Sequence, residues 1–422
     1  MKLVELIKKP LRGPVNKFRD FRAIKNFKRE RKIKRGDKRI RVGFIVQYIP
    51  AWNKFKPIYD ELKENDRFEV FLICVPIEIH SNKLDDPNDT GNKTYDYFVN
   101  NGYEAINALV GKNKWFEIKK LNLNYIFYPR PYNSFMPKKY VSGKVSKYAK
   151  ICSIMYGMSM TEEILETSLN KNFFRNVYCY FAESKNAAEK NIANFSRAHK
   201  LGLQKTVSYG MPVLVEMLKQ KNAKSDIWDF ANGKFKIMWT PRWTTDLKLG
   251  GSNFFTFKDF LIDYVKNSPD VAAVFRPHPL ALNNFVKNGD MTEEEAKSFI
   301  ESCNKDNKIF LDNSEDYIAT FWGSDALVTD ISGIMPEYFV TGKPLIYCAS
   351  NMILTPAEHT RKLLEGCYVV NDVEELKQCL NDLRNGLDPL KEIRQRIIIE
   401  LWGENLYQCN QKIIEELSKT AT

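Results

Sequence analysis

Residues 324–347 read SDALVTDISGIMPEYFVTGKPLIY, and this stretch decides the fold class. An apolar run at 326–329 is followed by a polar turn at 330–334, a helical pattern to about Thr341 and a second apolar run at 344–348. Short apolar runs on either side of a helix are typical of parallel strands joined by a crossover. The stretch therefore predicts one βαβ unit of a parallel sheet that is covered on both faces.

The same alternation continues on both sides of this stretch. In the second half, strands are predicted at 236–239, 271–275 and 309–311, with helices at 257–266, 292–303 and 317–322. In the first half, strands are predicted at 40–48, 69–75, 125–128 and 150–155. A polar stretch at 223–236 separates the halves, so the 422 residues are expected to form two α/β lobes.

The net positive charge of the chain comes entirely from residues 1–40. Residues 1–40 hold 16 Lys and Arg against 4 Asp and Glu, whereas the remainder holds 48 of each sign. A protein that binds nucleic acid more often carries a basic surface on its folded domain. The distribution therefore predicts a neutral body with a basic N-terminal arm at 1–38, and no nucleic-acid partner.

The arm has the pattern of an amphipathic helix. Phe18, Phe21, Ile24 and Phe27 recur every three residues, and Lys and Arg surround this apolar stripe. A basic amphipathic helix can lie in a lipid interface, where each cation near an anionic leaflet adds about 1 kcal/mol. We expect the arm to bind an anionic membrane surface, and the alternative is a helix packed on the protein's own body.

Several classes of protein are disfavoured by what the sequence lacks. No run approaches the roughly 18 apolar residues of a spanning helix, and no cleavable leader is predicted. The eight cysteines form no Cys-x-x-Cys pair, and only four histidines are present, so neither a metal site nor a disulfide framework is expected. No Walker loop occurs, and no Gly-x-Gly-x-x-Gly follows the first strand. These observations predict a cytoplasmic protein without a cofactor.

Polar residues follow three predicted strands of the second half. They are Arg242 after 236–239, Arg276 and His278 after 271–275, and Asp330, Ser332 and Gly333 after 326–329. Ligands of open parallel sheets bind beyond the carboxyl ends of the strands. An arginine offers a fork of donors to phosphate oxygens, a histidine can donate to a diphosphate, and a helix start favours an anion. The pattern predicts a binding site for a phosphate-containing donor.

Two acidic residues of this region have open roles. Asp330 is either a structural cap on its loop or a contact to the donor. Glu337, on the helix that follows, either contacts the ligand or lies on a solvated face. Both are kept as candidate donor-binding residues.

The first half offers fewer candidates. His80 follows a predicted strand with Glu78 two residues before it, and the two could form an acid/base pair. A surface histidine is the alternative. Tyr156 and Gly157 follow the strand at 150–155, and a glycine there permits close approach of a ligand to the backbone.

Three stretches resemble the CDP-glycerol glycerophosphotransferase family of teichoic-acid and capsule synthesis. They are TPRWT at 240–244, RPHP at 276–279 and the run at 324–347, in the family's order and spacing. The resemblance covers roughly 236–350 and implies a GT-B fold, with two Rossmann-like lobes facing across a cleft. It also implies transfer of glycerol phosphate from CDP-glycerol to a hydroxyl with release of CMP, without an obligatory metal, by a peripheral protein of the inner membrane face.

The resemblance assigns roles to residues of the predicted donor site. Arg276 and His278 are implied to contact the donor diphosphate, Ser332 and Gly333 to cradle it, and Arg242 to lie nearby. One departure concerns the catalytic base, because Tyr156 stands where the family usually has a histidine. A tyrosine, with a reference pKa of about 10, is a poor base at neutral pH. His80, Glu78 and Glu162 are therefore the alternative candidates.

The sequence thus predicts four segments and one leading function. The segments are the arm at 1–38, an acceptor lobe at 39–222, a donor lobe at 223–385 and C-terminal helices at 386–422. The function is transfer of a polyol phosphate, first of all glycerol phosphate, to a hydroxyl of a cell-surface glycan or lipid-linked acceptor. A GT-B glycosyltransferase using a nucleotide sugar and a catalytically inactive assembly partner are the alternatives.

Overall fold

The chain is divided into two compact units. The computed structural model describes residues 2–35, 39–304, 308–314, 317–349 and 353–419. Unit 1 comprises residues 1–156, 167–212 and 407–422, and unit 2 comprises residues 157–166 and 213–406. The chain thus passes from one unit to the other four times, whereas the sequence predicts one boundary near residue 222. Residues 1 and 36–38 of the predicted arm lie outside the described residues.

Unit 1 is built on a seven-stranded parallel sheet with the order β11-β10-β9-β8-β1-β2-β5. Its strands are β1 (Ile40–Val46), β2 (Phe68–Cys74), β5 (Ala105–Asn107), β8 (Tyr125–Phe127), β9 (Lys150–Ile154), β10 (Val177–Phe181) and β11 (Lys205–Val207). The chain builds the sheet outward from β1 toward β5 and then continues from β8 on the other side. The pair β1–β8 is therefore the switch point, where ligands of such sheets bind.

Unit 2 repeats this plan with six parallel strands in the order β14-β13-β12-β15-β16-β17. They are β12 (Phe235–Thr240), β13 (Val271–Phe275), β14 (Ile309–Leu311), β15 (Ala326–Thr329), β16 (Leu345–Cys348) and β17 (Tyr368–Val370). The switch point lies between β12 and β15, whose last residues, Thr240 and Thr329, are paired. The predicted parallel sheet and its βαβ unit are confirmed.

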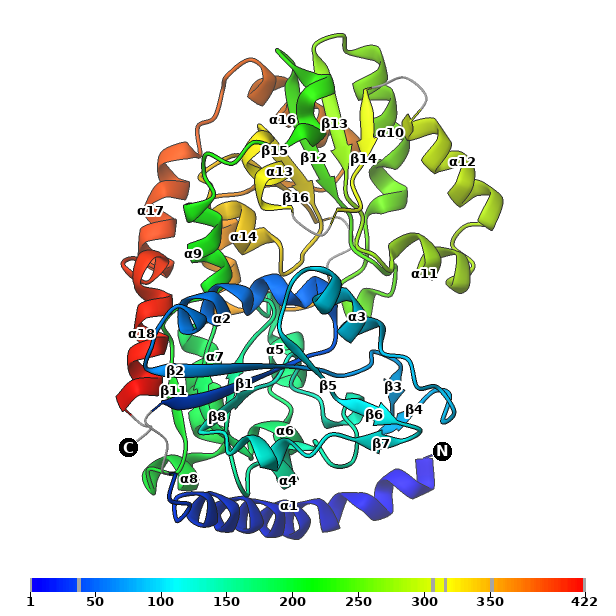
Figure 1. Cartoon of the computed structure of the whole chain (residues 1–422). Coiled ribbons are helices and arrows are strands. Elements are labelled where there is room, and N and C mark those ends of the chain that lie inside the picture. The colour runs from blue at the N-terminus through cyan, green and yellow to red at the C-terminus, as the bar shows by residue number, and fades with distance from the viewer. Residues whose placement is uncertain (1, 36–38, 305–307, 315–316, 350–352, 420–422) are drawn as a thin grey trace. The chain divides into compact units, whose positions relative to one another are not determined.

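Helices connect the strands of both sheets (Figure 1). In the first 219 residues they are α1 (Lys2–Glu30), η1 (Ile49–Lys54), α2 (Lys56–Lys63), α3 (Lys93–Asn100), η2 (Ile118–Leu121), η3 (Asn133–Phe135), α4 (Ser142–Val145), α5 (Glu162–Ser168), α6 (Lys171–Phe174), α7 (Lys185–Asn194), α8 (Ser196–Lys200) and α9 (Pro212–Lys219). The remainder holds η4 (Asp226–Ala231), η5 (Leu247–Leu249), α10 (Phe254–Asn267), α11 (Ala281–Asn288), α12 (Glu293–Asn304), α13 (Ile318–Gly323), α14 (Met335–Phe339), α15 (Glu358–Leu364), α16 (Val373–Arg384), α17 (Lys391–Leu401) and α18 (Asn405–Lys419). Two hairpins, β3 (Ile79–His80) with β4 (Lys83–Leu84) and β6 (Leu109–Gly111) with β7 (Lys114–Trp115), complete the structure.

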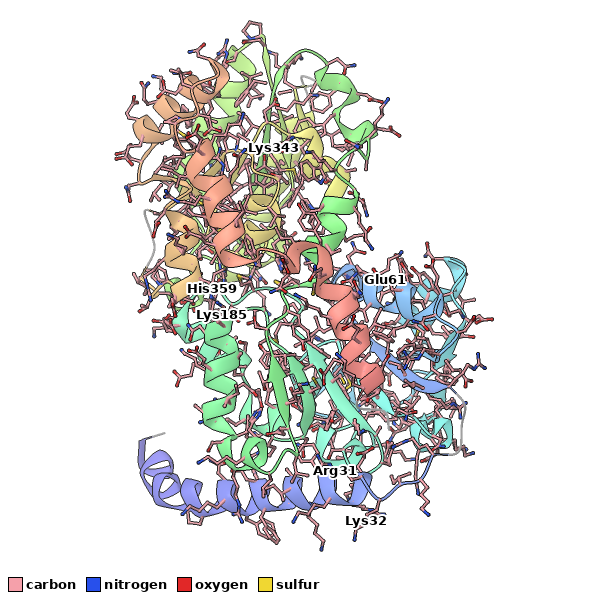
Figure 2. All side chains as sticks on the ribbon, turned by 90° about the vertical axis from the view of Figure 1, so that its left-hand side faces the viewer. Arg31, Lys32, Glu61, Lys185, Lys343 and His359 are labelled. Atoms are coloured by element: carbon pink, nitrogen blue, oxygen red, sulfur yellow. The ribbon has the colours of Figure 1, made fainter. Side chains whose placement is uncertain are left out.

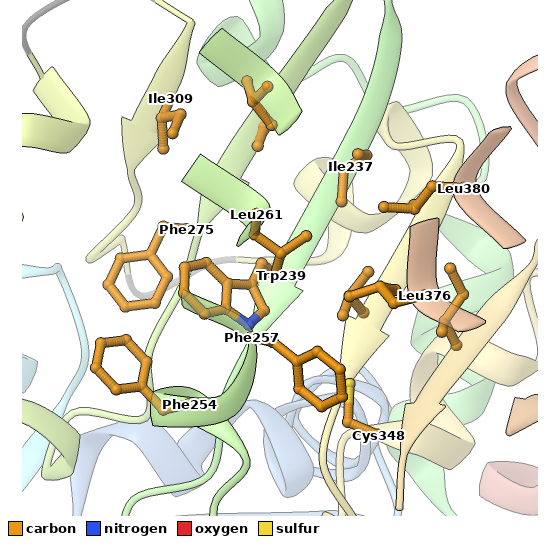
Figure 3. Close-up of a cluster of buried hydrophobic side chains, with 14 of the residues drawn as sticks. Ile237, Trp239, Phe254, Phe257, Leu261, Phe275, Ile309, Cys348, Leu376 and Leu380 are labelled. Carbon is orange, nitrogen blue, oxygen red and sulfur yellow. The ribbon is translucent and has the colours of Figure 1, made fainter. Parts of the chain in front are cut away.

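The core of unit 2 holds its switch point rigid. Trp239 of β12 stacks on Phe254 of α10 with ring centroids 5.5 Å apart and contacts Phe275 of β13 at 4.7 Å. These rings lie in one apolar cluster with Ile237 and Leu261 (Figure 3). Because Trp239 and Phe275 precede the predicted donor loops directly, their packing fixes where those loops begin.

Helix α1 lies along the side of unit 1 that carries α4 and α8 (Figure 1). Ala23, Ile24 and Phe27 are buried in one cluster with Ala198 and Leu203. The C-terminal end of the helical segment is also held, since Arg31, labelled in Figure 2, donates to the carbonyl of Gly202. The predicted single stripe is therefore divided: its C-terminal half packs on the body of unit 1.

The N-terminal half of the same stripe is exposed. The exposed fractions of Val15, Phe18 and Phe21 are 44%, 67% and 58%. A helix turns by 100° per residue, so a three-residue repeat drifts around the helix and cannot keep all four positions on one face. This drift explains why the four predicted residues have two different environments.

Two further observations concern membrane-spanning helices and disulfides. In the described part of the chain, no helix is long and apolar enough to cross a membrane. All eight cysteines are free thiols, and seven of them are buried. Ser184 caps α7, since its hydroxyl accepts a hydrogen bond from the backbone N–H of Ala187 at 3.1 Å.

Candidate functional site

Three loops meet at the carboxyl edge of the unit 2 sheet. They follow the neighbouring strands β13, β12 and β15 and begin at Arg276, Pro241 and Asp330. The loops after β12 and β15 flank the switch point, and the loop after β13 lies one strand away. The structure thus brings together the strand ends that the sequence predicts for the donor site.

Asp330 ties two of these loops together. Its Oδ2 accepts from the backbone N–H of Arg242 at 2.7 Å and from Ser252 Oγ at 2.9 Å. Its Oδ1 accepts from the backbone N–H and from Nδ2 of Asn253, both at 3.1 Å. Burial raises the pKa of Asp330, and these hydrogen bonds act against that rise. Because both oxygens are occupied and the residue is buried, the geometry favours the structural cap over the predicted donor contact.

The guanidinium of Arg242 is fixed beside this clamp. Its Nε donates to the carbonyl of Leu249 at 2.7 Å and its Nη1 to the carbonyl of Ile331 at 2.5 Å. Gly250, at a φ of +100°, makes the close approach possible, since a Cβ there would lie 2.8 Å from Arg242 Nε. The arginine is therefore preorganised, and Nη2 makes no hydrogen bond within the described part of the chain.

Two hydroxyls near this switch point, those of Thr240 and Ser332, have no hydrogen-bond partner among the described residues, and Ser332 lies in the predicted donor loop. Its Oγ is buried and has no hydrogen-bond partner among the described residues. A Cβ on Gly333 would lie 3.6 Å from the carbonyl oxygen of Met158, so backbone packs directly against this turn. Helix α14 begins only at Met335 and has five residues, so the predicted helix start lies further from Ser332 and its dipole is small.

His278 lies beside Arg242 and is neutral at physiological pH. Its Nδ1 accepts a hydrogen bond from the backbone N–H of Leu280 at 3.2 Å, which leaves the proton of the neutral ring on Nε2. Desolvation and, second, the charge of Arg242 lower its pKa to about 4. His278 is therefore a hydrogen-bond donor through Nε2 rather than a cation.

A groove of about 830 Å³ adjoins His278. It runs between α11 and α12 and is lined by apolar side chains such as Leu282 and Ile300, with Lys287 and Glu293 at its margin. The groove gives the His278 side of the site room for a bound molecule.

Arg276 has a different environment from the one predicted. Its Nη1 pairs with Asp312 Oδ2 at 2.7 Å, its Nη2 donates to the carbonyl of Ser314 at 2.7 Å, and its Cζ lies 5.2 Å from the centroid of the Tyr317 ring. The Tyr317 hydroxyl in turn donates to buried Glu337. Arg276 thus binds Asp312 and Ser314. To contact a diphosphate as well, it would have to share its ion pair with Asp312 between the carboxylate and the ligand. Glu337 does not lie on a solvated face.

Unit 1 has its own cluster at the switch point between β1 and β8. Gln47 and Tyr48 follow β1, and Arg130 and Tyr132 follow β8. Tyr156, which follows β9, is an electrostatic neighbour of both Tyr132 and Arg130. Burial raises the pKa of Tyr132 to about 12, so this phenol stays protonated at neutral pH. The predicted Tyr156 therefore lies within a cluster of phenols around a guanidinium.

His80 is exposed and paired with a carboxylate that the sequence did not indicate. Its Nδ1 lies 2.8 Å from Asp85 Oδ1 across the β3–β4 hairpin, while Glu78 is 3.9 Å from Lys93 Nζ. The imidazole also contacts the ring of Phe135 with centroids 5.8 Å apart. His80 thus forms an Asp–His pair rather than the predicted pair with Glu78.

One buried histidine of unit 2 was missed by the sequence reasoning. His359 of α15, labelled in Figure 2, has its Nε2 2.9 Å from the carbonyl oxygen of Ser159. Burial lowers its pKa, so it is neutral and its Nδ1 has no partner among the described residues. Through Ser159 it fixes the 157–161 segment that packs on Gly333. The sequence gives no local signal for this contact, because His359 and Ser159 are 200 residues apart.

The fold places the protein in the GT-B class, which is built from two Rossmann-like units. A variant of the wall teichoic acid polymerase TagF aligns with a TM-score of 0.59 at 13% identity, covering 99% of both chains. UDP-GlcNAc 2-epimerase from Neisseria meningitidis, bound to UDP-GlcNAc, aligns with a TM-score of 0.60 at 12% identity, covering 90% of this chain and 100% of that chain. MnaA from S. aureus, in a co-structure with UDP, gives 0.59 at 12% identity, with 91% and 98% covered. At these identities the likeness establishes the fold alone.

A family model matches part of the sequence. The model of the CDP-glycerol:poly(glycerophosphate) glycerophosphotransferases matches residues 153–354, which include all three predicted donor loops. No curated protein matches the chain in sequence. Residues 153–354 therefore match the model of this glycerophosphotransferase family, and the protein is an enzyme of the transferase class.

Proposed function

We propose that the protein transfers a polyol phosphate, first of all glycerol phosphate from CDP-glycerol, to a hydroxyl of a cell-surface glycan or lipid-linked acceptor. The observation that carries this proposal is the buried Ser332 hydroxyl, which has no partner among the described residues and lies in the loop after β15. Arg242 contacts the same loop through Ile331, and His278 lies beside Arg242. These groups together supply the donors that a diphosphate needs.

The reaction is a displacement at phosphorus. The acceptor oxygen attacks the phosphorus that carries the polyol, a new P–O bond forms, and the bond to the CMP phosphate breaks. Ser332 Oγ, His278 Nε2 and Arg242 stabilise the negative charge that passes to departing CMP. Because His278 is neutral when the site is empty, it contributes a hydrogen bond and not a full charge.

The acceptor hydroxyl loses its proton during this step, and His80 is the best candidate to accept it. Asp85 holds Nδ1, so that Nε2 can take the proton, and the carboxylate then stabilises the imidazolium. Tyr156 lies among protonated phenols and suits hydrogen bonding to the acceptor rather than proton abstraction. Asp85→Asn should lower kcat by roughly tenfold or more with little change in the affinity for CDP. Unchanged kcat would remove His80 from the mechanism.

The donor is tested by product release. CMP release would be measured with CDP-glycerol, with other CDP-polyols and with nucleotide sugars, together with a phosphorylated polyol acceptor. Release of CMP from a CDP-polyol supports the proposal. Turnover of a nucleotide sugar instead supports the glycosyltransferase alternative, which the fold shared with UDP-GlcNAc-binding proteins also accommodates. Binding of a donor without any turnover indicates an inactive assembly partner.

We also propose that α1 binds an anionic membrane surface at the inner face of the cell membrane. Val15, Phe18 and Phe21 form the exposed apolar part, and Lys17 and Arg22 beside them are exposed as well. The double change Phe18→Ser and Phe21→Ser should reduce binding to vesicles with anionic lipids, most clearly at low salt. Val110→Ser, which alters an exposed apolar residue of β6, is the control. Equal binding of both variants would contradict membrane docking through α1.

A further inference from the structure

Arg130 is the shielded arginine that lacks a carboxylate. Six of the other arginines whose side chains are described and not exposed form ion pairs, namely Arg35–Glu30, Arg41–Glu69, Arg175–Asp20, Arg276–Asp312, Arg384–Asp270 and Arg394–Asp388. The seventh, Arg242, bonds to Asp330 through its backbone N–H, and the charge of Asp330 acts on its guanidinium. The electrostatic neighbours of Arg130 are instead three tyrosines, Tyr48, Tyr132 and Tyr156. A guanidinium shielded from water without a counter-ion is unfavourable, so its retention calls for an anion from outside the chain.

The donors of Arg130 are only partly used. Its Nη2 donates to Gln47 Oε1 at 2.8 Å, while its buried Nε has no partner among the described residues. The guanidinium lies over the Phe135 ring, with Cζ 4.2 Å from the centroid, which orients the plane of the fork. The remaining N–H groups can therefore meet an incoming oxyanion without a rearrangement of the side chain.

The surroundings of Arg130 are fixed in advance. Gln47 Nε2 donates to the carbonyls of Pro76 and Phe135, each at 2.8 Å, so its Oε1 is held toward the arginine. The following loop is closed by Asn133, whose Oδ1 accepts from the backbone N–H of Ser142 at 2.7 Å. These contacts join the ends of β1 and β8, so the cluster is built across the switch point of unit 1.

We propose that Arg130 and the phenols of Tyr48, Tyr132 and Tyr156 form a binding site for a phosphate group carried by the acceptor, an inference that rests on the proposed polyol-phosphate transfer. The number of donors favours phosphate over carboxylate. A carboxylate offers two oxygens, which the fork of one arginine can saturate, whereas a phosphate has further oxygens for the phenol hydroxyls. The acceptor hydroxyl would then lie in unit 1, next to a recognised phosphate of the same molecule.

The site is tested by binding, independently of turnover. Glycerol 3-phosphate, glycerate and glycerol share a three-carbon frame and differ in the charged group. Their binding would be measured by calorimetry at constant ionic strength, with the donor unit saturated by CDP. Arg130→Gln should weaken binding of glycerol 3-phosphate roughly tenfold or more, and Arg130→Lys less, since it keeps the charge. Arg41→Gln, which breaks a pair with Glu69 at the other end of β1, is the matched control and should bind as the wild type does.

Three outcomes would overturn the inference. Equal affinity of wild type and Arg130→Gln would remove Arg130 from the site. Loss of all glycerol 3-phosphate binding on saturation with CDP would place the phosphate in the donor unit. Equal binding of glycerate would indicate a carboxylate site. In a kinetic arm, Arg130→Gln should raise KM for a phosphorylated acceptor and leave the Kd of CDP unchanged. If the wild-type protein turned over no CDP-polyol, the proposed transfer would be wrong. The calorimetry would still show whether Arg130 binds a phosphate.

Discussion

The two units share one strand order but differ in the charge balance at their switch points. In unit 2, Arg242 follows the first strand of the sheet and has the buried carboxylate of Asp330 beside it. In unit 1, Arg130 follows the strand across the switch point from β1 and has tyrosines around it. In the first arrangement the arginine has a carboxylate of the chain beside it, and the buried side-chain groups without a partner among the described residues are the neutral hydroxyls of Thr240 and Ser332. The second leaves a cation whose partner has to come from a ligand.

The difference lies in which groups hold the loops in place and which groups are available to a ligand. At the carboxyl edge of the unit 2 sheet, charge is used to hold loops in place, and neutral donors such as Ser332 and His278 are left for the ligand. At the unit 1 switch point, amides and carbonyls hold the loops, and the charge itself is left for the ligand. Substitutions in the two units should therefore divide differently between stability and binding.

The largest expected effect is on the Asp330 clamp. Asp330→Asn loses the carboxylate that accepts four hydrogen bonds, and one of its two side-chain atoms becomes a donor that faces donors. We expect a loss of about 2–4 kcal/mol in the free energy of unfolding. Urea denaturation measures it, and Asp229→Asn, at an exposed position, is the control. A wild-type midpoint for Asp330→Asn would show that the clamp does not hold unit 2 together.

In contrast to substitution of Asp330, substitution of Ser332 should affect ligand binding more than stability. Its hydroxyl has no partner to lose in the described chain, so Ser332→Ala should change the free energy of unfolding by no more than about 0.5 kcal/mol. The affinity for CDP should fall by about tenfold, which is about 1.4 kcal/mol. Ser324→Ala is the matched control, because this buried hydroxyl already bonds to Phe321 and Tyr338. Ser324→Ala should destabilise without affecting CDP, and the same behaviour in Ser332→Ala would mark Ser332 as purely structural.

His278 should make the free energy of unfolding depend on pH. The pKa of His278 is about 4 in the folded protein, below the value of about 6.5 expected in the unfolded chain. Between these values the unfolded state binds more protons, so the stabilising contribution is present above pH 6.5 and is lost as the pH falls toward 4. His278→Asn should flatten this part of the profile, which urea midpoints at pH 4.5, 5.5 and 7 would measure. Parallel profiles would show that His278 has an ordinary pKa.

Arg130 should give the smallest effect on stability. In Arg130→Gln the amide can still donate toward Gln47, and a poorly compensated charge is removed. We expect a free energy of unfolding within about 0.5 kcal/mol of the wild type, or above it. Arg41→Gln should cost about 1 kcal/mol, since Glu69 loses its nearer partner at 3.1 Å and keeps only Arg39 at 3.9 Å. Thermal unfolding without ligand compares the two, and a larger loss for Arg130→Gln would indicate that the arginine is part of the scaffold.

Much of the fold could be predicted from local patterns. The strands at 271–275, 309–311 and 326–329 have the predicted bounds because each is a short buried apolar run between polar loops. The two small hairpins were missed, since two-residue strands leave no periodic signal.

The site was harder to predict because its contacts are distant in sequence. Arg276 and His278 are neighbours in the RPHP motif, yet one pairs with Asp312 and the other lies beside Arg242. The isolation of Arg130 depends on which carboxylates the fold keeps away from it. A missing partner is a property of the tertiary structure and leaves no mark in the sequence.

The last helix of the chain gives unit 1 a particular order of assembly. Leu417 of α18 accepts a hydrogen bond from the buried Tyr125 hydroxyl at 3.0 Å, and Glu416 pairs with Lys205 at 2.6 Å. During translation these residues emerge from the ribosome only after residues 213–406 have been made. The unit that begins first would therefore be completed last, and a nascent chain would need to shield its open sheet until α18 arrives.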